Sequence, residues 1–219
     1  MRGPAWTTGA FFAKIPHMKR FPLSGSLALC LALLASSCIG IDSSASIAAN
    51  GSVSLAIDYK VSLAVDELGR LDANSAYLPL PVGRADLELA STRAGGQLNS
   101  WSRSDAADSF TIKAAISFPN LAAFASFMDP TGQDAVYSEQ GARKTLSMRI
   151  GSGRPPANAD LSRFVEQAFA DYRIRLSFQL PAAIVDNSGF TVNGRTASFD
   201  MAAAAVYASA SPIALRLTW

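Results

Sequence analysis

Histidine and cysteine are nearly missing from this chain of 219 residues, which contains one histidine and two cysteines. The histidine is His17 and the cysteines are Cys30 and Cys38, so neither residue type occurs after position 38. This absence excludes Ser-His-Asp and Cys-His catalysis, and histidine-based zinc or iron sites, from the rest of the chain. It also excludes disulfides and thiolate metal sites within residues 39–219.

Charged residues are also sparse, at 16% of the chain, against about 25% in ordinary soluble domains. Residues 1–37 contain four Lys and Arg residues and no acid. Residues 38–219 therefore hold 15 Lys and Arg against 17 Asp and Glu, a net charge of −2. The longest basic run in that part is Arg143-Lys144. We therefore expect no nucleic-acid partner.

Residues 18–37 have the three parts of a secretory signal peptide. Met18-Lys19-Arg20 is basic, residues 27–35 form an apolar run of nine, and the run ends in Ala35-Ser36-Ser37. The run is too short to cross a bilayer as a helix, which takes about 20 residues. This signal is complete from Met18 onward, so translation starts either at Met18 or at Met1. In the first case residues 1–17 are an upstream extension, and in the second they are part of an unusually long N-terminal region of the signal.

Cys38 directly follows these small residues, and the segment resembles the lipobox of bacterial lipoprotein signals, with Ala35 where leucine is usual. In such signals the cysteine thiol receives a diacylglyceryl group, and cleavage occurs before the cysteine. The resemblance implies lipidation of Cys38 and a stable membrane anchor, because two acyl chains hold a protein at a bilayer. It also implies a location in the bacterial cell envelope, periplasmic or surface-exposed. The alternative is an ordinary cleaved signal with a free Cys38 thiol.

Two regions follow the signal. Residues 38–50 are small and polar, which predicts a flexible tether between the lipid and the domain. Residues 51–219 contain no convincing Pro/Gly linker and no repeat of fixed period. We therefore predict a single domain over residues 51–219.

Apolar and polar residues alternate in many segments of this domain, which predicts strands with one buried face. The longest alternation runs from Val53 to Val65, and Asn193-Gly194 is the strongest hairpin signal. Asp186-Asn187-Ser188-Gly189 predicts a turn. The predicted strands are residues 53–65, 98–101, 109–118, 135–138, 145–150, 172–180, 190–192, 196–199 and 213–219.

Helical signals occur in three segments. Residues 83–94 precede Gly95-Gly96, which is typical of a helix end. Asn120 and Asn158 each precede apolar residues spaced along one helical face, which predicts two capped helices. Strands dominate, so the predicted fold class is α+β, with a mainly antiparallel sheet and about three helices.

No motif for catalysis, cofactors or metals stands out. The loop Gly151-Ser152-Gly153-Arg154 lacks the lysine and the spacing of a P-loop. Asp66, Glu67 and Asp72 surround a turn without the regular alternation of an EF-hand, and a solvated turn explains them better. We therefore predict no cofactor and no metal site.

Trp101 and Tyr77 are the candidate ligand-binding residues. Trp101 has polar neighbours, where an indole can stack on a sugar, lie at a lipid interface, or instead plug the core from a strand end. Tyr77 begins the loop YLPLPV, residues 77–82, which can line the mouth of an apolar pocket or pack over the core.

Several short motifs, taken in order, resemble the LppM-type lipoprotein domain over residues 48–219. They are the long alternating strand with its acidic turn, Ser-Phe-Pro-Asn-Leu at 117–121, Arg-Leu-Ser-Phe-Gln-Leu-Pro at 175–181, Asn193-Gly194 and the terminal Trp219. The resemblance implies a membrane-anchored α+β domain associated with lipid or glycolipid recognition, without established catalytic residues.

These observations predict a membrane-anchored bacterial envelope lipoprotein that binds a lipid or glycolipid and is not an enzyme. The alternative is a scaffold that docks other envelope proteins through an exposed strand edge. A third hypothesis is a hydrolase that uses only carboxylates, which requires an acid pair in a cleft with raised pKa values.

Overall fold

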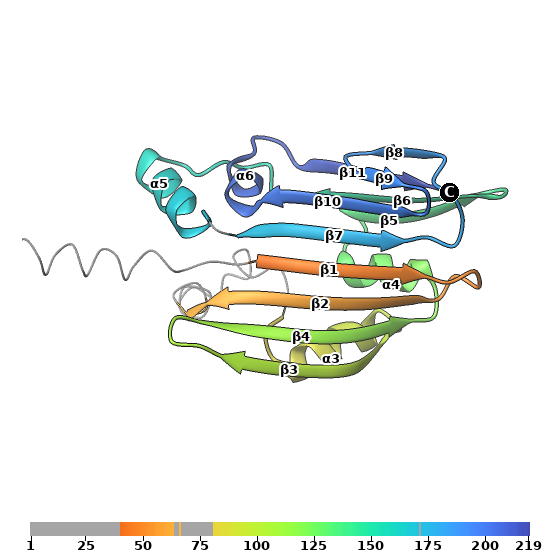
Figure 1. Ribbon diagram of the computed structural model, residues 1–219, viewed down its shortest axis with the longest axis horizontal. Coiled ribbons are helices and arrows are strands. Elements are labelled where there is room, and N and C mark those ends of the chain that lie inside the picture. Colours follow the sequence, from red (N-terminus) through yellow and green to blue (C-terminus); the bar gives the residue numbers. More distant parts are fainter. Residues whose placement is uncertain (1–39, 64–65, 67–80, 171) are drawn as a thin grey trace, which may run out of the picture. The chain divides into compact units, whose positions relative to one another are not determined.

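Strands form most of the regular structure of the described residues (Figure 1). The computed structural model describes residues 40–63, 66, 81–170 and 172–219. The described residues belong to one compact unit. The predicted extension, signal peptide and lipidation site, residues 1–38, lie outside them.

The large sheet has seven strands in the order β3-β4-β2-β1-β7-β10-β9. Neighbouring strands are antiparallel except β1 and β7, which run parallel. The strands are β1 (Gly40–Ile47), β2 (Val53–Ser62), β3 (Gln97–Asp105), β4 (Ser109–Phe118), β7 (Arg173–Gln179), β9 (Thr191–Asn193) and β10 (Thr196–Ala202). The long alternation predicted from Val53 is confirmed as β2, although the strand ends at Ser62 rather than Val65.

The small sheet has four strands in the order β5-β6-β11-β8, and each neighbouring pair is antiparallel. Its strands are β5 (Ala135–Gln140), β6 (Arg143–Ile150), β8 (Asp186–Ser188) and β11 (Ile213–Thr218). The predicted strands 135–138 and 145–150 are confirmed as β5 and β6, which pair with each other as a hairpin. The last strand of the chain, β11, lies between β6 and β8, so it belongs to the small sheet rather than to the large one.

The helices of the described part are α3 (Arg84–Arg93), α4 (Leu121–Met128), α5 (Ala159–Ala168) and α6 (Ala203–Ala208). Both predicted asparagine caps are confirmed. The Asn120 side chain accepts a hydrogen bond from the Ala123 amide, and the Asn158 side chain accepts one from the Leu161 amide, each at 2.8 Å. Within the described residues, no helix combines the length and the apolar character needed to cross a bilayer.

The predicted tether, residues 38–50, is wrong for most of its length because residues 40–47 form β1. This strand lies inside the large sheet, antiparallel to β2 on one side and parallel to β7 on the other. Its exposure alternates, with Ala45 and Ile47 buried and Ser44 and Ser46 exposed. The side chains are small and polar on average, so the strand is stabilised by pairing on both sides rather than by strong hydrophobicity. The domain therefore begins near Gly40, not at residue 51.

Three further details differ from the sequence predictions. The strands form two sheets rather than one. Residues 203–208 form a helix that was not predicted, although alanine is the strongest helix former. The predicted turn Asp186–Ser188 is a short strand. All three of its residues are exposed, so its sequence lacks the alternation of apolar and polar residues that indicates a strand. The sheet-dominated α+β class is confirmed.

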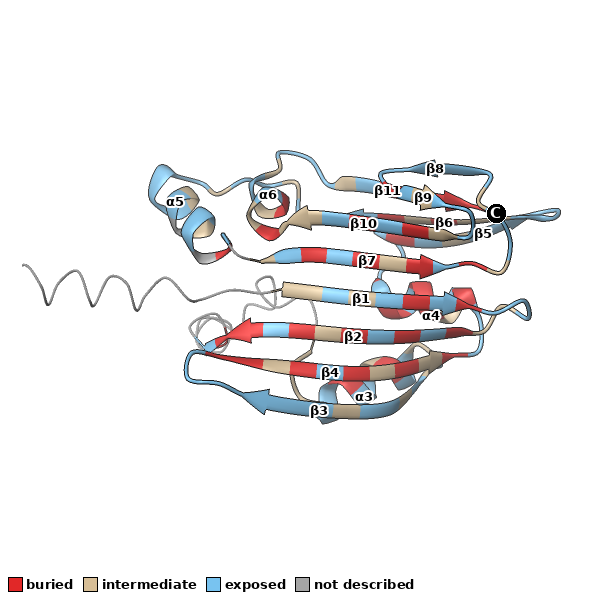
Figure 2. Ribbon diagram, in the orientation of Figure 1, coloured by how far each residue is buried: buried red, intermediate tan, exposed pale blue. Residues whose placement is uncertain are grey.

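Buried and exposed residues alternate along the strands of the large sheet (Figure 2), so the core lies on one face of this sheet. Leu55, Ile57 and Tyr59 of β2 are buried on this inner face, while the neighbouring Ser54 and Ala56 are exposed. Phe124 of α4 packs edge-on against Phe118 and Phe178, with ring centroids 5.7 and 6.3 Å apart. The buried residues of both sheets and of the helices belong to one continuous cluster.

Strand β1 provides a direct test of the fold. Because its amides pair on both sides, we expect hydrogen exchange in residues 41–47 to be slower by a factor of about 10³ or more than at the exposed turn around Gly141. Hydrogen–deuterium exchange followed by mass spectrometry measures both segments in one sample. Exchange of residues 41–47 within seconds, as in a tether, would contradict this strand assignment.

Candidate ligand-binding cavity

A cavity of about 740 Å³ lies against the inner face of the large sheet. Its volume falls within the range of about 300–1,000 Å³ that is usual for small-molecule sites. The lining comes from the large sheet, the small sheet, α4, α5, α6 and the loop of residues 151–157. The site therefore depends on both sheets being in place.

Three adjacent strands, β1, β2 and β7, form the sheet wall of the cavity. Ser43 of β1 lies between Ile57 of β2 and Leu176 of β7 in the strand register. A serine between two branched aliphatic side chains leaves volume unfilled above the sheet, and this free volume is part of the cavity. The wall consists of Ile41, Ser43, Leu55, Ile57, Ile174 and Leu176.

The opposite wall is also largely apolar. Phe127 and Met128 come from the end of α4, and Leu161 and Val165 come from α5. Methionine side chains are flexible and adapt to apolar ligands of different shape. The other apolar residues of this wall are Ala135, Met148, Ile150, Pro155, Pro156, Ala157, Val206 and Tyr207.

The loop of residues 151–157 forms part of the rim, and two glycines hold it in place. Gly151 and Gly153 have φ angles of 81° and 65°, which side chains other than glycine rarely adopt. A Cβ atom on Gly153 would overlap Pro212, and one on Gly151 would lie 3.1 Å from a methyl group of Val206. Because the loop packs so closely on the residues around α6, its position on the rim is well defined.

The two arginines on the rim differ in whether their charge is paired. Arg149 forms an ion pair with Asp134 at 2.9 Å and also donates to the Gln133 carbonyl. Arg154 is exposed, and its guanidinium has no hydrogen-bond or ion-pair partner among the described residues. Arg154 is therefore an unpaired cation among the described residues of the rim, whereas the charge of Arg149 is balanced by Asp134.

Asp129 is a structural carboxylate at the edge of the cavity. Its Oδ1 accepts hydrogen bonds from the amide and hydroxyl of Thr131, and its Oδ2 accepts from the amides of Asp134 and Ala135. These hydrogen bonds, that of the Thr131 hydroxyl above all, hold the pKa of Asp129 well below its usual value. Asp129 therefore remains ionised and fixes the turn between α4 and β5.

Tyr207 brings a phenol to the wall formed by α6. Its ring packs on Phe169, with ring centroids 4.6 Å apart. Burial raises the pKa of Tyr207 to about 12, so the hydroxyl stays protonated at neutral pH and can donate a hydrogen bond. Ser43 and Ser152 are the other neutral polar side chains of the described lining.

The residues predicted from the sequence do not gather at this cavity. Cys38 and Tyr77 lie outside the described residues. Trp101 lies opposite Ala114 of β4, is partly buried against the core and does not line the cavity. It borders a smaller hollow of about 370 Å³ instead. Its indole N–H is buried without a partner within the part of the chain that the structure describes.

The acidic turn predicted at residues 66–72 is described only at Asp66, which is buried. Glu67 and Asp72 lie outside the described residues. Among residues 40–63, 66, 81–170 and 172–219, no group of three or more His, Cys, Asp or Glu side chains is placed to hold a metal ion.

Sequence reasoning missed the cavity residues themselves. The apolar face of residues 159–168 was predicted, and it includes Leu161 and Val165. That periodicity does not show whether the face borders free volume or a packed core. Ser43 lies in the predicted tether, so the sequence gives no indication that it lines a cavity.

Asp129 generates a prediction about acid stability. Because its pKa is lower in the folded state, Asp129 stabilises the fold above its usual pKa of 3.8, and this stabilisation is lost as the pH falls below that value toward the folded pKa. An asparagine cannot accept at both side-chain atoms, so we expect Asp129→Asn to lower the free energy of unfolding by about 1–3 kcal/mol at pH 7. The variant should also lose less stability than the parent protein between pH 5 and 2 (about the range of carboxylate titration).

Urea unfolding at several pH values measures both effects. Asp160→Asn is the matched control, because the Asp160 side chain is 89% exposed and its removal should change stability by no more than about 0.5 kcal/mol. Equal stability of the Asp129 and Asp160 variants would show that the turn does not depend on the Asp129 carboxylate.

No family model matches the chain, and no curated protein matches it in sequence. Among solved structures, the chain is similar to the NMR structure of the folded domain of the LppM protein from Mycobacterium tuberculosis, with a TM-score of 0.50 and 13% sequence identity. The match covers 84% of this chain and 90% of that chain. At this identity the likeness concerns the fold alone: the chain shares its α+β architecture with the LppM folded domain.

Proposed function

We propose that this chain is a membrane-anchored bacterial envelope lipoprotein whose domain binds a lipid or another amphiphile in the cavity and is not an enzyme. The observation that carries the proposal is the cavity of about 740 Å³ with aliphatic and methionine walls. Each methylene group transferred from water into such a site contributes about 0.8 kcal/mol. A sugar or a polar metabolite needs several fixed hydrogen-bonding groups instead, and these walls offer few.

The membrane anchor is supported by the sequence around Cys38. A basic start, an apolar run and small residues precede this cysteine in the order found in lipoprotein signals. The fold similarity to the LppM domain agrees with the resemblance of the short motifs. An acyl-binding cavity has a supply of ligand close by when its domain is attached to a membrane.

The acids of the cavity support binding rather than hydrolysis. Asp129 and Asp134 are the carboxylates of the described lining. A general acid needs a raised pKa, whereas hydrogen bonds lower the pKa of Asp129. Asp134 is held by Arg149 in an ion pair. The carboxylate-only hydrolase therefore has no support from the residues that line the cavity.

Docking of another protein along a strand edge is the alternative function. Strand β3 is an edge of the large sheet, and most of its residues are exposed. A strand of a partner protein could therefore hydrogen-bond to the free edge of β3. However, the register with β4 shifts between Leu98 and Ser100, and such bulges oppose continuous pairing at an edge. The cavity is therefore the better-supported site.

The anchor is tested by the Cys38→Ala variant. We expect the parent protein to incorporate labelled fatty acid and to sediment with membranes, because two acyl chains bind a bilayer stably. The variant should lose the label and appear in the soluble fraction. Continued labelling and membrane retention of the variant would show that Cys38 is not the acylation site.

The cavity is tested by filling it. Ser43 faces the cavity, while Ser44 is exposed on the other face of the same strand, so Ser43→Phe and Ser44→Phe are a matched pair. We expect the Cys38→Ala form to co-purify with lipid in native mass spectrometry. Ser43→Phe should reduce the bound fraction at least about tenfold, equivalent to about 1.4 kcal/mol, whereas Ser44→Phe should leave it unchanged.

Thermal unfolding of both variants shows whether each is folded. A phenylalanine that enters free volume should be tolerated, whereas one forced into a packed core costs about 1–3 kcal/mol. A parent protein that is always empty, or equal lipid loss in both variants, would contradict lipid binding in this cavity.

A further inference from the structure

Strand β1 begins two residues after Cys38, so little chain separates the proposed lipid anchor from the folded domain. An extended chain spans at most about 3.6 Å per residue, which keeps the Cα atom of Cys38 within about 7 Å of that of Gly40. β1 is hydrogen-bonded to a strand on each side, so it cannot lengthen this connection without leaving the sheet. If Cys38 carries the lipid, the end of the sheet at Gly40 is held at the membrane.

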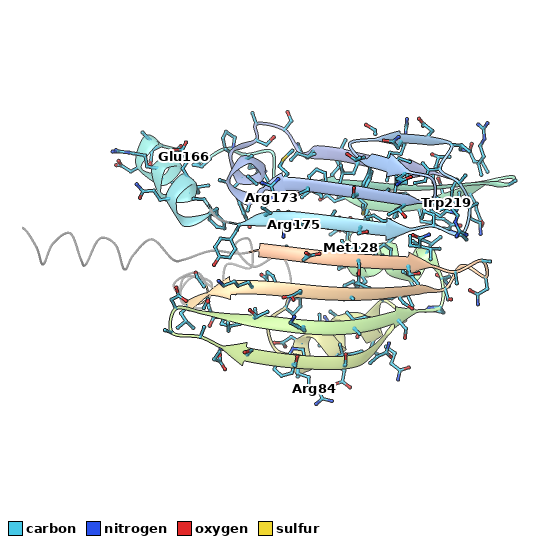
Figure 3. All side chains as sticks on the ribbon, in the orientation of Figure 1. Arg84, Met128, Glu166, Arg173, Arg175 and Trp219 are labelled. Carbon is cyan, nitrogen blue, oxygen red and sulfur yellow. The ribbon has the colours of Figure 1, made fainter. Side chains whose placement is uncertain are left out.

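The elements at this end of the large sheet follow from the strand register. Ile41 pairs with Ile174, so β7 starts beside the start of β1. The helix α5 directly precedes β7, and Gly40 pairs with Lys60 near the end of β2. We call this region, formed by the starts of β1 and β7, the end of β2 and α5, the anchor end. In Figure 3, Glu166 of α5 lies at this end, while Trp219 lies at the opposite end.

Apolar and aromatic side chains are exposed or nearly exposed at the anchor end. Leu161 of α5 and Leu63, directly after β2, each have 37% of their surface exposed. The ring of Tyr172 packs over the backbone of Gly40, and the Lys60 ammonium lies 5.3 Å from the centroid of that ring. Leucines that face solvent, with a tyrosine and a lysine beside them, are a combination suited to a membrane–water interface.

The cavity also reaches this end. Ile41 and Ile174, at the starts of β1 and β7, line it, and so do Leu161 and Val165 of α5. Because Leu161 both lines the cavity and is exposed, the cavity reaches the surface beside α5. The same helix therefore borders the cavity and stands next to the proposed anchor.

We propose that the anchor end rests on the membrane and that the cavity opens toward the bilayer, so that a lipid enters it directly from the membrane. The partner is a lipid surface, and the ligand is one of its own lipid molecules. This inference rests on the proposed function, because it takes Cys38 as the attachment point and an acyl chain as the occupant. It adds an orientation, which neither lipidation nor lipid binding requires.

Site-specific fluorescence quenching tests the orientation. The full chain is prepared as Leu161→Cys and, separately, as Val185→Cys, and mass spectrometry first establishes acylation of Cys38. An acylated Cys38 cannot react with a maleimide, and Cys30 belongs to the cleaved signal, so the introduced thiol takes the bimane label. The proteins are reconstituted into phosphatidylcholine–phosphatidylglycerol vesicles that contain a lipid with a spin label near its headgroup.

Val185 is the matched control because it is 65% exposed and follows the far end of β7. Seven residues of strand separate the two ends by about 20 Å, so we expect quenching to be at least about threefold stronger for the Leu161→Cys label. Equal quenching at both positions, or stronger quenching at Val185→Cys, would overturn the orientation.

Two additional variants separate this inference from the proposed function. Ser43→Phe in the Leu161→Cys protein should abolish lipid uptake but leave the quenching unchanged, because Ser43 is inside the cavity and not on the anchor end. If Cys38 proves unmodified, the proposed anchor is wrong. Cys38→Ser proteins added to the same vesicles then test the anchor end alone, and a lack of preferential quenching at Leu161→Cys would overturn it.

Discussion

The pairing of β1 with both β2 and β7 is the interaction on which the rest of the domain depends. One half of the large sheet, β3-β4-β2, comes from residues 53–118, and the other half, β7-β10-β9, comes from residues 173–202. β1 joins the two halves and makes the one parallel pairing of this sheet. Without β1, β2 and β7 have no shared neighbour, and the wall that carries Ser43 is lost. The cavity and the path to the anchor therefore both depend on a strand of small and polar residues.

Ser43 illustrates a balance between stability and free volume. A leucine at this position would bury apolar surface between Ile57 and Leu176 and contribute about 1.5–3 kcal/mol. Serine gives up that contribution and leaves room above the sheet, on the side that the cavity occupies. Sites that bind ligands commonly differ in this way from the most stable packing of the same fold. The aromatic contacts of Phe124 with Phe118 and Phe178 pack the core elsewhere.

Local patterns predicted those elements whose stabilising interactions are visible in the sequence. Alternation identified β2 and β4, and the side chains of Asn120 and Asn158 identified the starts of α4 and α5. β1 could not be predicted because its inward residues include Ser43 and Ala45, so its sequence is only weakly apolar and its stability comes from two strands that are distant in sequence. The cavity could not be predicted for a related reason. Its free volume depends on how side chains from several elements pack, and a local stretch of sequence contains no information about that packing.

The short connection between Cys38 and β1 also changes how strongly the cavity needs to bind. The anchor holds the site, rather than the ligand, at the bilayer, where lipid is concentrated, and we take an effective lipid concentration of about 1 mM, the order that short linkers give for joined partners. A dissociation constant of about 1 mM corresponds to a binding free energy of about 4.1 kcal/mol. Burial of roughly five methylene groups, at about 0.8 kcal/mol each, supplies that much. In the proposed arrangement, a cavity lined by a few aliphatic side chains is therefore enough to hold part of an acyl chain while still releasing it, and no strong polar recognition is required.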